Sequence, residues 1–330
     1  MNAAVLRNPG PVSQGSLRLE ERPVPKPAPG EVLVRVRACG VCRTDLHIVE
    51  GELPVHRRPL VPGHQIVGEV IAGNGSEYSV GTRVGVSWLG GTDGTCRYCG
   101  MGRENLCDAP VFTGYDRDGG FAEYATARVD FVYPLPDALN DLQAAPLLCA
   151  GIIGFRALRV AGVQPGEHVG LYGFGASAHL ALPVLQAWNC SVSVATRGVG
   201  HRAFAEKLGA DWVGDELDRP PQPLDRAITF APSGDVVIAA LGALRKGGVV
   251  AINAIHLDRM PAFDYDRLLW GEREIRSVAN MTRDDARDFL ALAVQINLRP
   301  RATAFPLDHI VQALCAVKED AVNGAAVIMF

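Results

Sequence analysis

The stretch HVGLYGFGASA at residues 168–178 decides the fold of the second half of this chain. Its first five residues form an apolar run of strand length, and the apolar pattern resumes after the glycines with helical character as far as Trp188. Gly173, Gly175 and Ala178 occupy the positions of the G-x-G-x-x-G/A pattern, in which a strand turns into a helix whose free N–H groups receive a pyrophosphate. The pattern predicts a dinucleotide site on a parallel sheet.

Around this stretch, residues 151–285 alternate between strand and helix patterns. We expect further strands at 191–195, 225–231 and 248–254, and helices at 201–208 and 236–244. Such alternation predicts an α/β domain with a doubly wound parallel sheet and right-handed crossovers. The sequence therefore places a nucleotide-binding domain at residues 151–285.

Residues 1–150 have a different pattern, typical of short strands joined by loops rich in Pro and Gly. Val32, Val34 and Val36 alternate with other residues as in a half-buried strand, and a second strand is expected at 66–71 with a turn at 72–75. The chain ends in the apolar segment AAVIMF at 325–330, which we expect to return to the first domain as a strand. The first domain is therefore predicted to comprise 1–150 and 286–330.

Three short segments of the first domain each carry part of a zinc ligand set. Cys42 lies in CRTDLH, His64 in PGH and Cys149 in LLCAG. Two thiolates and one imidazole make three protein ligands and leave the fourth tetrahedral position open, which distinguishes catalytic from structural zinc. A Lewis-acid metal near a nicotinamide points to hydride transfer at an alcohol or carbonyl carbon.

The residues around Cys42 would serve that chemistry. The hydroxyl of Thr44 can pass a proton onward, and His47 can deliver it to solvent. Asp45 is suited to orient His64 through a hydrogen bond to the other ring nitrogen. Each ligand alone has a simpler interpretation, since a cysteine in an apolar run is most often a core residue; the metal hypothesis depends on their occurring together.

Taken together, these motifs resemble the zinc-dependent alcohol dehydrogenases of the medium-chain dehydrogenase/reductase superfamily over essentially the full chain. The resemblance rests on GVCRTDLH at 40–47, PGH at 62–64, a cysteine lobe around Cys96, LLCAG at 147–151 and the Gly-rich turn. It implies a β-rich, GroES-like catalytic domain and a Rossmann nucleotide domain. It also implies catalytic zinc on the three ligands above, and contacts of Arg43 and Arg283 with the cofactor pyrophosphate. Dimers or tetramers formed through the nucleotide domains are expected.

The chain departs from the pattern of that family at three places. Gln65 follows His64 where a glutamate is usual, and Ile152-Ile153 stands where a threonine near the nicotinamide is common. The structural zinc lobe normally offers four cysteines, whereas this chain offers Asp93, Cys96, Cys99 and Cys107. Because a carboxylate oxygen is an acceptable zinc ligand, we predict a filled second site. The alternative is an empty lobe in which Asp93 pairs with Arg97 or Arg103.

Cofactor and substrate preferences are predicted from single positions. The second strand of the nucleotide domain runs into Thr196-Arg197 and lacks the acidic residue that binds the adenosine ribose. Since Arg197 or Arg202 would pair with a 2′-phosphate, the sequence favours NADP, with NAD as the alternative. Trp88 and Leu53 are expected to narrow the substrate pocket, which favours short primary alcohols and the matching aldehydes.

The bulk properties agree with a cytoplasmic enzyme. The net charge is −4 and no run of Lys or Arg stands out, so neither nucleic acid nor an anionic membrane is an expected partner. The longest apolar run, around 142–155, is interrupted by Pro146 and is too short to span a bilayer. The first residues lack the pattern of a secretory signal, and the cysteines are better explained as ligands and buried thiols than as disulfides. Two other hypotheses remain: a zinc-free enone or quinone reductase of the same fold, and a non-enzymatic nucleotide-binding protein.

Overall fold

A computed structural model describes residues 1–73 and 78–330 of the chain. The expected turn at 72–75 runs into residues outside this description. The described chain forms two compact units, of which the first comprises Met1–Ala150, Asn280–Val294 and Arg299–Phe330, and the second comprises Gly151–Ala279 and Gln295–Leu298. The return to the first unit thus begins at Asn280, before the predicted boundary at 286, and the short segment 295–298 belongs with the second unit.

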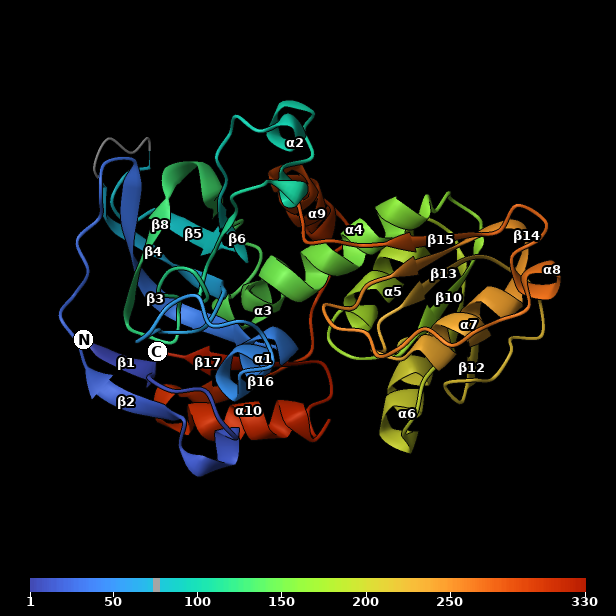
Figure 1. Cartoon of the computed structure of the whole chain (residues 1–330). Helices are drawn as coiled ribbons and strands as arrows, with labels where there is room; N and C mark the ends of the chain where they lie inside the picture. Colours follow the sequence, from blue (N-terminus) through green and yellow to red (C-terminus); the bar gives the residue numbers. More distant parts are fainter. Residues whose placement is uncertain (74–77) are drawn as a thin grey trace. The chain divides into compact units, whose positions relative to one another are not determined.

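The first unit is built mainly of antiparallel strands (Figure 1). Its strands are β1 (Asn2–Leu6), β2 (Leu17–Glu21), β3 (Glu31–Val41), β4 (Gln65–Gly73), β5 (Arg83–Val86), β6 (Leu89–Gly91), β7 (Val111–Phe112), β8 (Tyr124–Arg128), β9 (Val132–Pro134), β16 (Ala302–Pro306) and β17 (Ala325–Met329). Its helices are α1 (Arg43–Glu50), α2 (Arg97–Gly100), α3 (Asp141–Pro146), α10 (Ile310–Lys318) and all of α9 (Arg283–Gln295) except its last residue.

The main sheet of this unit has the strand order β16-β17-β3-β4-β5-β9, with β8 also paired to β3. Along β3, Val32, Val34 and Val36 are buried while Arg35 and Arg37 are exposed, which is the predicted alternation. The C-terminal strand β17 pairs antiparallel with β3, so the last residues of the chain complete the sheet that its first residues begin.

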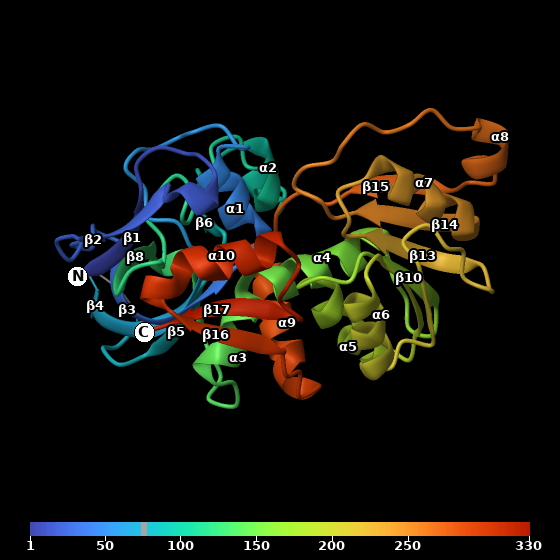
Figure 2. The same cartoon turned by 90° about the horizontal axis from the view of Figure 1, so that it is seen from below.

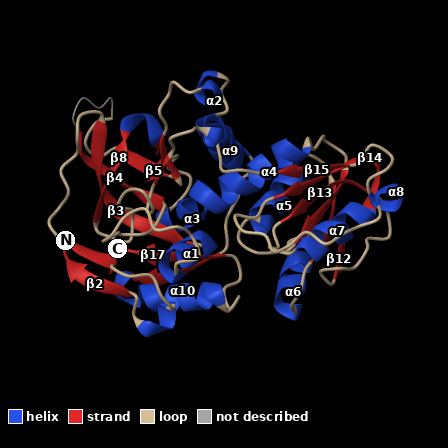
Figure 3. Ribbon diagram, viewed as in Figure 1, coloured by secondary structure: helices blue, strands red, loops and turns tan. Residues whose placement is uncertain are grey.

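The second unit is a parallel six-stranded sheet with helices on both faces. Its strands are β10 (His168–Tyr172), β11 (Ser191–Ala195), β12 (Trp212–Gly214), β13 (Leu224–Thr229), β14 (Leu244–Ile252) and β15 (Glu274–Ser277), and its helices are α4 (Ile152–Ala161), α5 (Ala178–Ala187), α6 (Val199–Lys207), α7 (Gly234–Ala243) and α8 (Tyr265–Leu268). Figure 2 shows α5 and α6 on one face and α7 on the other. Strand and helix alternate along the chain as the sequence predicted (Figure 3).

The strand order of this sheet, β12-β11-β10-β13-β14-β15, locates the nucleotide site. The chain moves outward from β10 in one direction through β11 and β12, then crosses back to β13 on the other side. A reversal of this kind is the topological switch point of doubly wound folds, where ligands bind at the carboxyl ends of the strands. The Gly-rich turn leaves β10 at that end.

Candidate metal centres and nucleotide site

Cys42, His64 and Cys149 come together in the first unit. Their ligand atoms all lie within 4.8 Å of one another, and Cys42 Sγ lies 3.3 Å from His64 Nε2. Ligands of a tetrahedral zinc, at about 2.3 Å for sulfur and about 2.0 Å for nitrogen, are separated by about 3.5 Å. The donor types and their spacing therefore fit a zinc ion held by three protein ligands.

Cys42 is positioned by the junction between a strand and a helix. β3 ends at Val41, and Cys42 is the extended N-cap residue of α1. Its Sγ accepts the Thr44 N–H at 3.3 Å, and Asp45 Oδ2 accepts the Cys42 N–H at 2.9 Å, which is the reciprocal arrangement of a capping box. The C-R-T-D sequence thus forms the helix start and presents the sulfur at the same time.

His64 is fixed from both sides. Its Nδ1 lies 3.0 Å from Asp45 Oδ1, and both side chains are fully buried, so Nε2 is left to face Cys42. The preceding Gly63 has φ +96°, and a Cβ there would meet the backbone nitrogen of Phe121 at 2.8 Å. Glycine is therefore required before His64. The edge of Trp88 packs against the imidazole with ring centroids 5.0 Å apart.

Cys149 lies in a local irregularity of a helix. Residues Leu147–Gly151 form a π-helical turn between α3 and α4. Pro146 precedes this turn and has no N–H to continue the α-helical hydrogen bonds. Turns of this type are frequent at functional sites because they redirect one side chain without ending the helix.

Without a bound cation, the protons of this cluster are held on Cys149 and His64. The hydrogen bond from Cys149 holds the pKa of the Cys42 thiol well below its usual value, and the same bond, with burial, raises the pKa of Cys149. Burial alone would lower the pKa of His64, but Asp45 and Cys42 together raise it well above the usual value. Metal binding needs two thiolates and a neutral imidazole, so a cation would displace the protons held there.

The residues predicted to relay protons, Thr44 and His47, both lie on α1. Thr44, one turn before His47, contacts Cys42 through its N–H. Nδ1 of His47 contacts the carboxylate of Glu52, and the His47 side chain is 19% exposed whereas that of Glu52 is 56% exposed. Glu52 was missed by sequence reasoning, because a carboxylate in the loop after α1 has no signature without the fold.

Gln65 is buried directly after His64. Its side chain packs against Gly40, where a Cβ would approach Gln65 Nε2 to 2.8 Å. Within the described part of the chain its Oε1 accepts no hydrogen bond. A buried carbonyl oxygen without a partner is uncommon in proteins, and here it belongs to the residue that replaces a glutamate.

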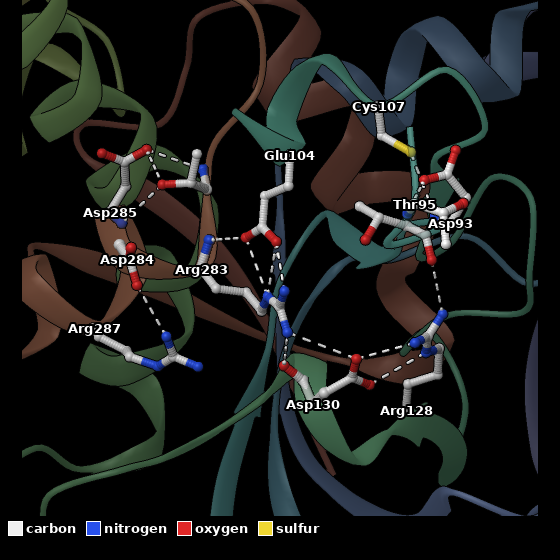
Figure 4. Close-up of polar contacts among 12 residues, drawn as sticks. Asp93, Thr95, Glu104, Cys107, Arg128, Asp130, Arg283, Asp284, Asp285 and Arg287 are labelled. Atoms are coloured by element: carbon white, nitrogen blue, oxygen red, sulfur yellow. Dashed lines mark hydrogen bonds and ion pairs between the residues drawn. The ribbon is translucent and has the colours of Figure 1, made fainter. Parts of the chain in front are cut away.

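Asp93, Cys96, Cys99 and Cys107 form a second cluster, again with all ligand atoms within 4.8 Å of one another. Asp93 Oδ1 accepts the N–H groups of Cys96 and Thr95, each at 2.9 Å, which holds the pKa of this carboxyl well below its usual value. The Asp93 N–H in turn donates to Cys107 Sγ at 3.4 Å (Figure 4). The aspartate is therefore an integral part of the cluster and carries a negative charge.

The alternative pairing of Asp93 with an arginine is not observed. Among the described residues, neither Arg97 nor Arg103 forms an ion pair with this carboxylate. One carboxylate and three thiols at this spacing fit a second, closed zinc site.

The Gly-rich turn of the second unit fits a dinucleotide. Gly173 has φ +87°, and a Cβ there would meet the backbone nitrogen of Ala231 at 3.0 Å. Gly175, in contrast, has no atom within 4 Å of a Cβ position, so the backbone is open to a close approach. α5 begins at Ala178 and no side chain caps its N-terminus, which leaves N–H groups for a phosphate.

Comparison with known proteins identifies the family of this chain. Residues 28–137 match the alcohol dehydrogenase GroES-like domain. The chain is 48% identical to the probable alcohol dehydrogenase AdhA of Mycobacterium tuberculosis, over 100% of this chain and 97% of that protein. This chain belongs to the medium-chain alcohol dehydrogenases.

Two solved structures are similar to this alcohol dehydrogenase along its whole length. The cobalt- and zinc-bound alcohol dehydrogenase of Pyrobaculum aerophilum has a TM-score of 0.90 and 25% identity, covering 100% of this chain and 99% of that one. The acetophenone reductase of Geotrichum candidum in complex with NAD has a TM-score of 0.89 and 25% identity, covering 100% and 97%.

Two arginines predicted to contact pyrophosphate have carboxylate partners in the first unit of the dehydrogenase. Arg43 Nη2 lies 2.5 Å from Asp320 Oδ1. Arg283 donates to Glu104 from its backbone N–H and from its guanidinium, with its closest contact at 2.6 Å, and also reaches Asp130 at 3.6 Å (Figure 4). Their contact with a cofactor remains a prediction.

The predicted substrate wall of the dehydrogenase is aromatic. Trp88 is 8% exposed and stacks on Phe112, with ring centroids 4.8 Å apart and planes inclined by 12°. Tyr115 packs against Trp88 as well, and it lines a small hollow together with Leu53. Because Trp88 also packs against His64, this wall begins at a predicted metal ligand.

The expectation that the apolar run at 142–155 is too short to span a bilayer is wrong as to length, because this run lies within a helical stretch, Asp141–Ala161, that is long and apolar enough to cross a membrane. However, 72% of its most apolar segment is buried inside the protein, and the stretch contains the π-helical turn Leu147–Gly151. Such burial is typical of a core helix.

Proposed function

We propose that this alcohol dehydrogenase is a zinc enzyme that transfers hydride between NAD(P) and short primary alcohols or their aldehydes. The observation that carries the proposal is the cluster of Cys42, His64 and Cys149, which supplies three ligands and, among the described residues, no fourth. The similar enzyme of Pyrobaculum aerophilum is described as cobalt- and zinc-bound, and that of Geotrichum candidum as an NAD complex. When bound, zinc would supply a Lewis acid that polarises the substrate oxygen, and the nicotinamide would supply the hydride partner.

The proton of the alcohol must leave a buried site, and three side chains offer a route. Thr44 lies beside Cys42 and would exchange a proton through its hydroxyl. His47 would receive the proton, and its contact with Glu52 would hold the imidazole in place. The increasing exposure from His47 to Glu52 directs the path toward solvent.

The second cluster is proposed to hold a structural zinc on Asp93, Cys96, Cys99 and Cys107. Four ligands close the coordination sphere, which suits stability and not turnover. The short helix α2 contains no buried residue. A metal would therefore supply the cross-link that this segment cannot obtain from a hydrophobic core.

We also propose the size of the substrate, the oligomeric state and the cellular compartment of the enzyme. Trp88 beside His64 narrows the space next to the metal ligands, which favours short unbranched alcohols. The edge strand β15 and the exposed side chains of Tyr265 and Trp270 favour a homodimer or homotetramer formed through the second unit. All cysteines are free thiols, as a cytoplasmic enzyme requires.

Metal content and turnover test this function together. Purified, dialysed protein is expected to contain two zinc atoms per chain, one for each cluster, and to oxidise short primary alcohols with a nicotinamide cofactor. Cys149→Ala should lose one zinc atom and at least about a thousandfold in turnover, an effect of about 4 kcal/mol. Cys315→Ala, which removes a thiol outside both clusters, is the matched control and should change neither. Alcohol oxidation by Cys149→Ala at the original rate would refute the zinc mechanism.

A further inference from the structure

The residue that follows β11 in the second unit is Thr196, which carries no carboxylate and already forms hydrogen bonds within the protein. Thr196 is 2% exposed, and its Oγ1 accepts the N–H of Phe174 at 3.2 Å. The same hydroxyl donates to the carbonyl of Arg197 at 3.4 Å. Thr196 thus fastens the Gly-rich turn to the strand, and its hydroxyl has no hydrogen left for an adenosine ribose.

Asp215, which directly follows the neighbouring strand β12, supplies a carboxylate at the same edge of the sheet. β11 and β12 are parallel with Ala195 opposite Gly214, and the Thr196 N–H donates to the Gly214 carbonyl at 3.0 Å. Thr196 and Asp215 directly follow this last pair, and Arg202 contacts both of them. The acidic residue expected at the end of the second strand is therefore found at the end of the third.

Asp215 is held in place by several contacts. Its Oδ1 accepts the N–H of Glu216 at 2.8 Å, and its own N–H donates to Asp218 Oδ2 at 2.8 Å. Its Oδ2 pairs with Arg202 Nη1 at 3.1 Å, and that nitrogen also donates to the Thr196 carbonyl at 3.3 Å. The Arg202 side chain, which contacts the residue after β11, is therefore already neutralised by a carboxylate.

The surface around this pair is acidic. An open hollow of about 440 Å³ has Arg202, Glu206, Asp215 and Asp218 as its charged lining residues. Three carboxylates face one guanidinium there, and the balance stays negative even if the adjacent Arg197 is added. A 2′-phosphate carries between about one and a half and two negative charges at neutral pH, so the field of this hollow opposes it.

We propose that Asp215 determines the cofactor preference: it accepts a hydrogen bond from the adenosine ribose of NAD and withholds Arg202 from a 2′-phosphate. The inference rests on the proposed nucleotide-binding function of the second unit and refines it. It reverses the preference for NADP that Thr196-Arg197 suggested, because the carboxylate missing from that strand is delivered by the adjacent one.

The test measures binding of ADP-ribose and of 2′-phospho-ADP-ribose to the full-length protein by calorimetry, which requires neither zinc chemistry nor turnover. The unchanged protein should bind ADP-ribose at least about tenfold more tightly. Asp215→Asn should bring the two affinities within about threefold of each other. It should weaken the binding of ADP-ribose and strengthen the binding of 2′-phospho-ADP-ribose. Glu206→Gln removes the same charge from the same hollow without touching Arg202, and as the matched control it should keep the preference.

Arg202→Gln separates the two parts of the proposal. Alone, it should leave the preference for ADP-ribose in place, and added to Asp215→Asn it should cancel the gain in 2′-phosphate binding. Thermal unfolding of each variant shows whether the fold is intact. Tighter binding of the 2′-phosphate form by the unchanged protein, or equal effects of Asp215→Asn and Glu206→Gln, would overturn the proposal. Failure of both nucleotides to bind would overturn the nucleotide function as well.

Discussion

Glu104→Gln is expected to destabilise the first unit because Glu104 holds the start of α9 through Arg283 (Figure 4). The carboxylate accepts the Arg283 backbone N–H at 2.6 Å, the Nε at 2.9 Å and the Nη2 at 2.6 Å, and its side chain is only 10% exposed. This pairing also raises the pKa of Arg283, chiefly through the hydrogen bonds to Glu104. The contact joins residues 179 positions apart in the sequence.

The expected loss of unfolding free energy in Glu104→Gln follows from the number and kind of these hydrogen bonds. A hydrogen bond to a charged group contributes about 1.5–3 kcal/mol net, and removing one partner of a buried ion pair costs about 3–5 kcal/mol. Glutamine keeps one acceptor, Arg283 retains Asp130 at 3.6 Å, and its guanidinium still lies over the ring of Phe131 at 4.6 Å. The expected loss is therefore about 2–4 kcal/mol, a fall in Tm of about 5–15 °C for a unit of this size.

Calorimetric and urea unfolding, with zinc content measured in parallel, would test this estimate. Asp284→Asn provides the control, because Asp284 pairs with Arg287 on the same helix but both side chains are largely exposed, at 77% and 60%. Such a pair contributes at most about 0.5 kcal/mol. Equal effects of the two substitutions would refute the reasoning.

Three further outcomes are expected. Asp93→Ala should lose one zinc atom per chain and lower the Tm while turnover per remaining zinc is unchanged; full retention of both metals would exclude Asp93 as a ligand. Gln65→Glu should keep zinc bound and change turnover by less than about tenfold, and loss of metal in this variant would contradict it. Glu50 accepts the Val12 N–H at 3.1 Å and pairs with Lys318 at 2.7 Å, and although burial opposes its charge, these partners lower its pKa. Its stabilisation should therefore be present above the usual glutamate range and disappear as the pH falls through the lowered pKa. Glu50→Gln should cost about 1 kcal/mol of unfolding free energy at neutral pH and nothing at low pH, and a cost independent of pH would argue against the ion pair.

Much of the local structure could be predicted from the residues. β10 and β11 have the bounds that the apolar runs indicated, and the glycines between β10 and α5 are required by the turn they form. The predicted ligands Cys42 and His64 lie in short motifs whose neighbours, Asp45 and Gly63, are needed for the same local geometry. Such motifs can be recognised in the sequence because the local conformation is determined by residues only a few positions apart.

The contacts that only the tertiary structure decided join distant segments. The π-helical turn at Cys149 and the contact of His47 with Glu52 depend on how neighbouring residues pack, and their sequences carry no distinctive pattern. Glu104 meets Arg283 only because α9 returns to the first unit. Asp215 reaches the end of β11 only through the register of two parallel strands. Sequence by itself determined which chemical groups the chain possesses and the turns that present them; folding decided which charges neutralise one another, because the energy of an ion pair depends on distance in space and not along the chain.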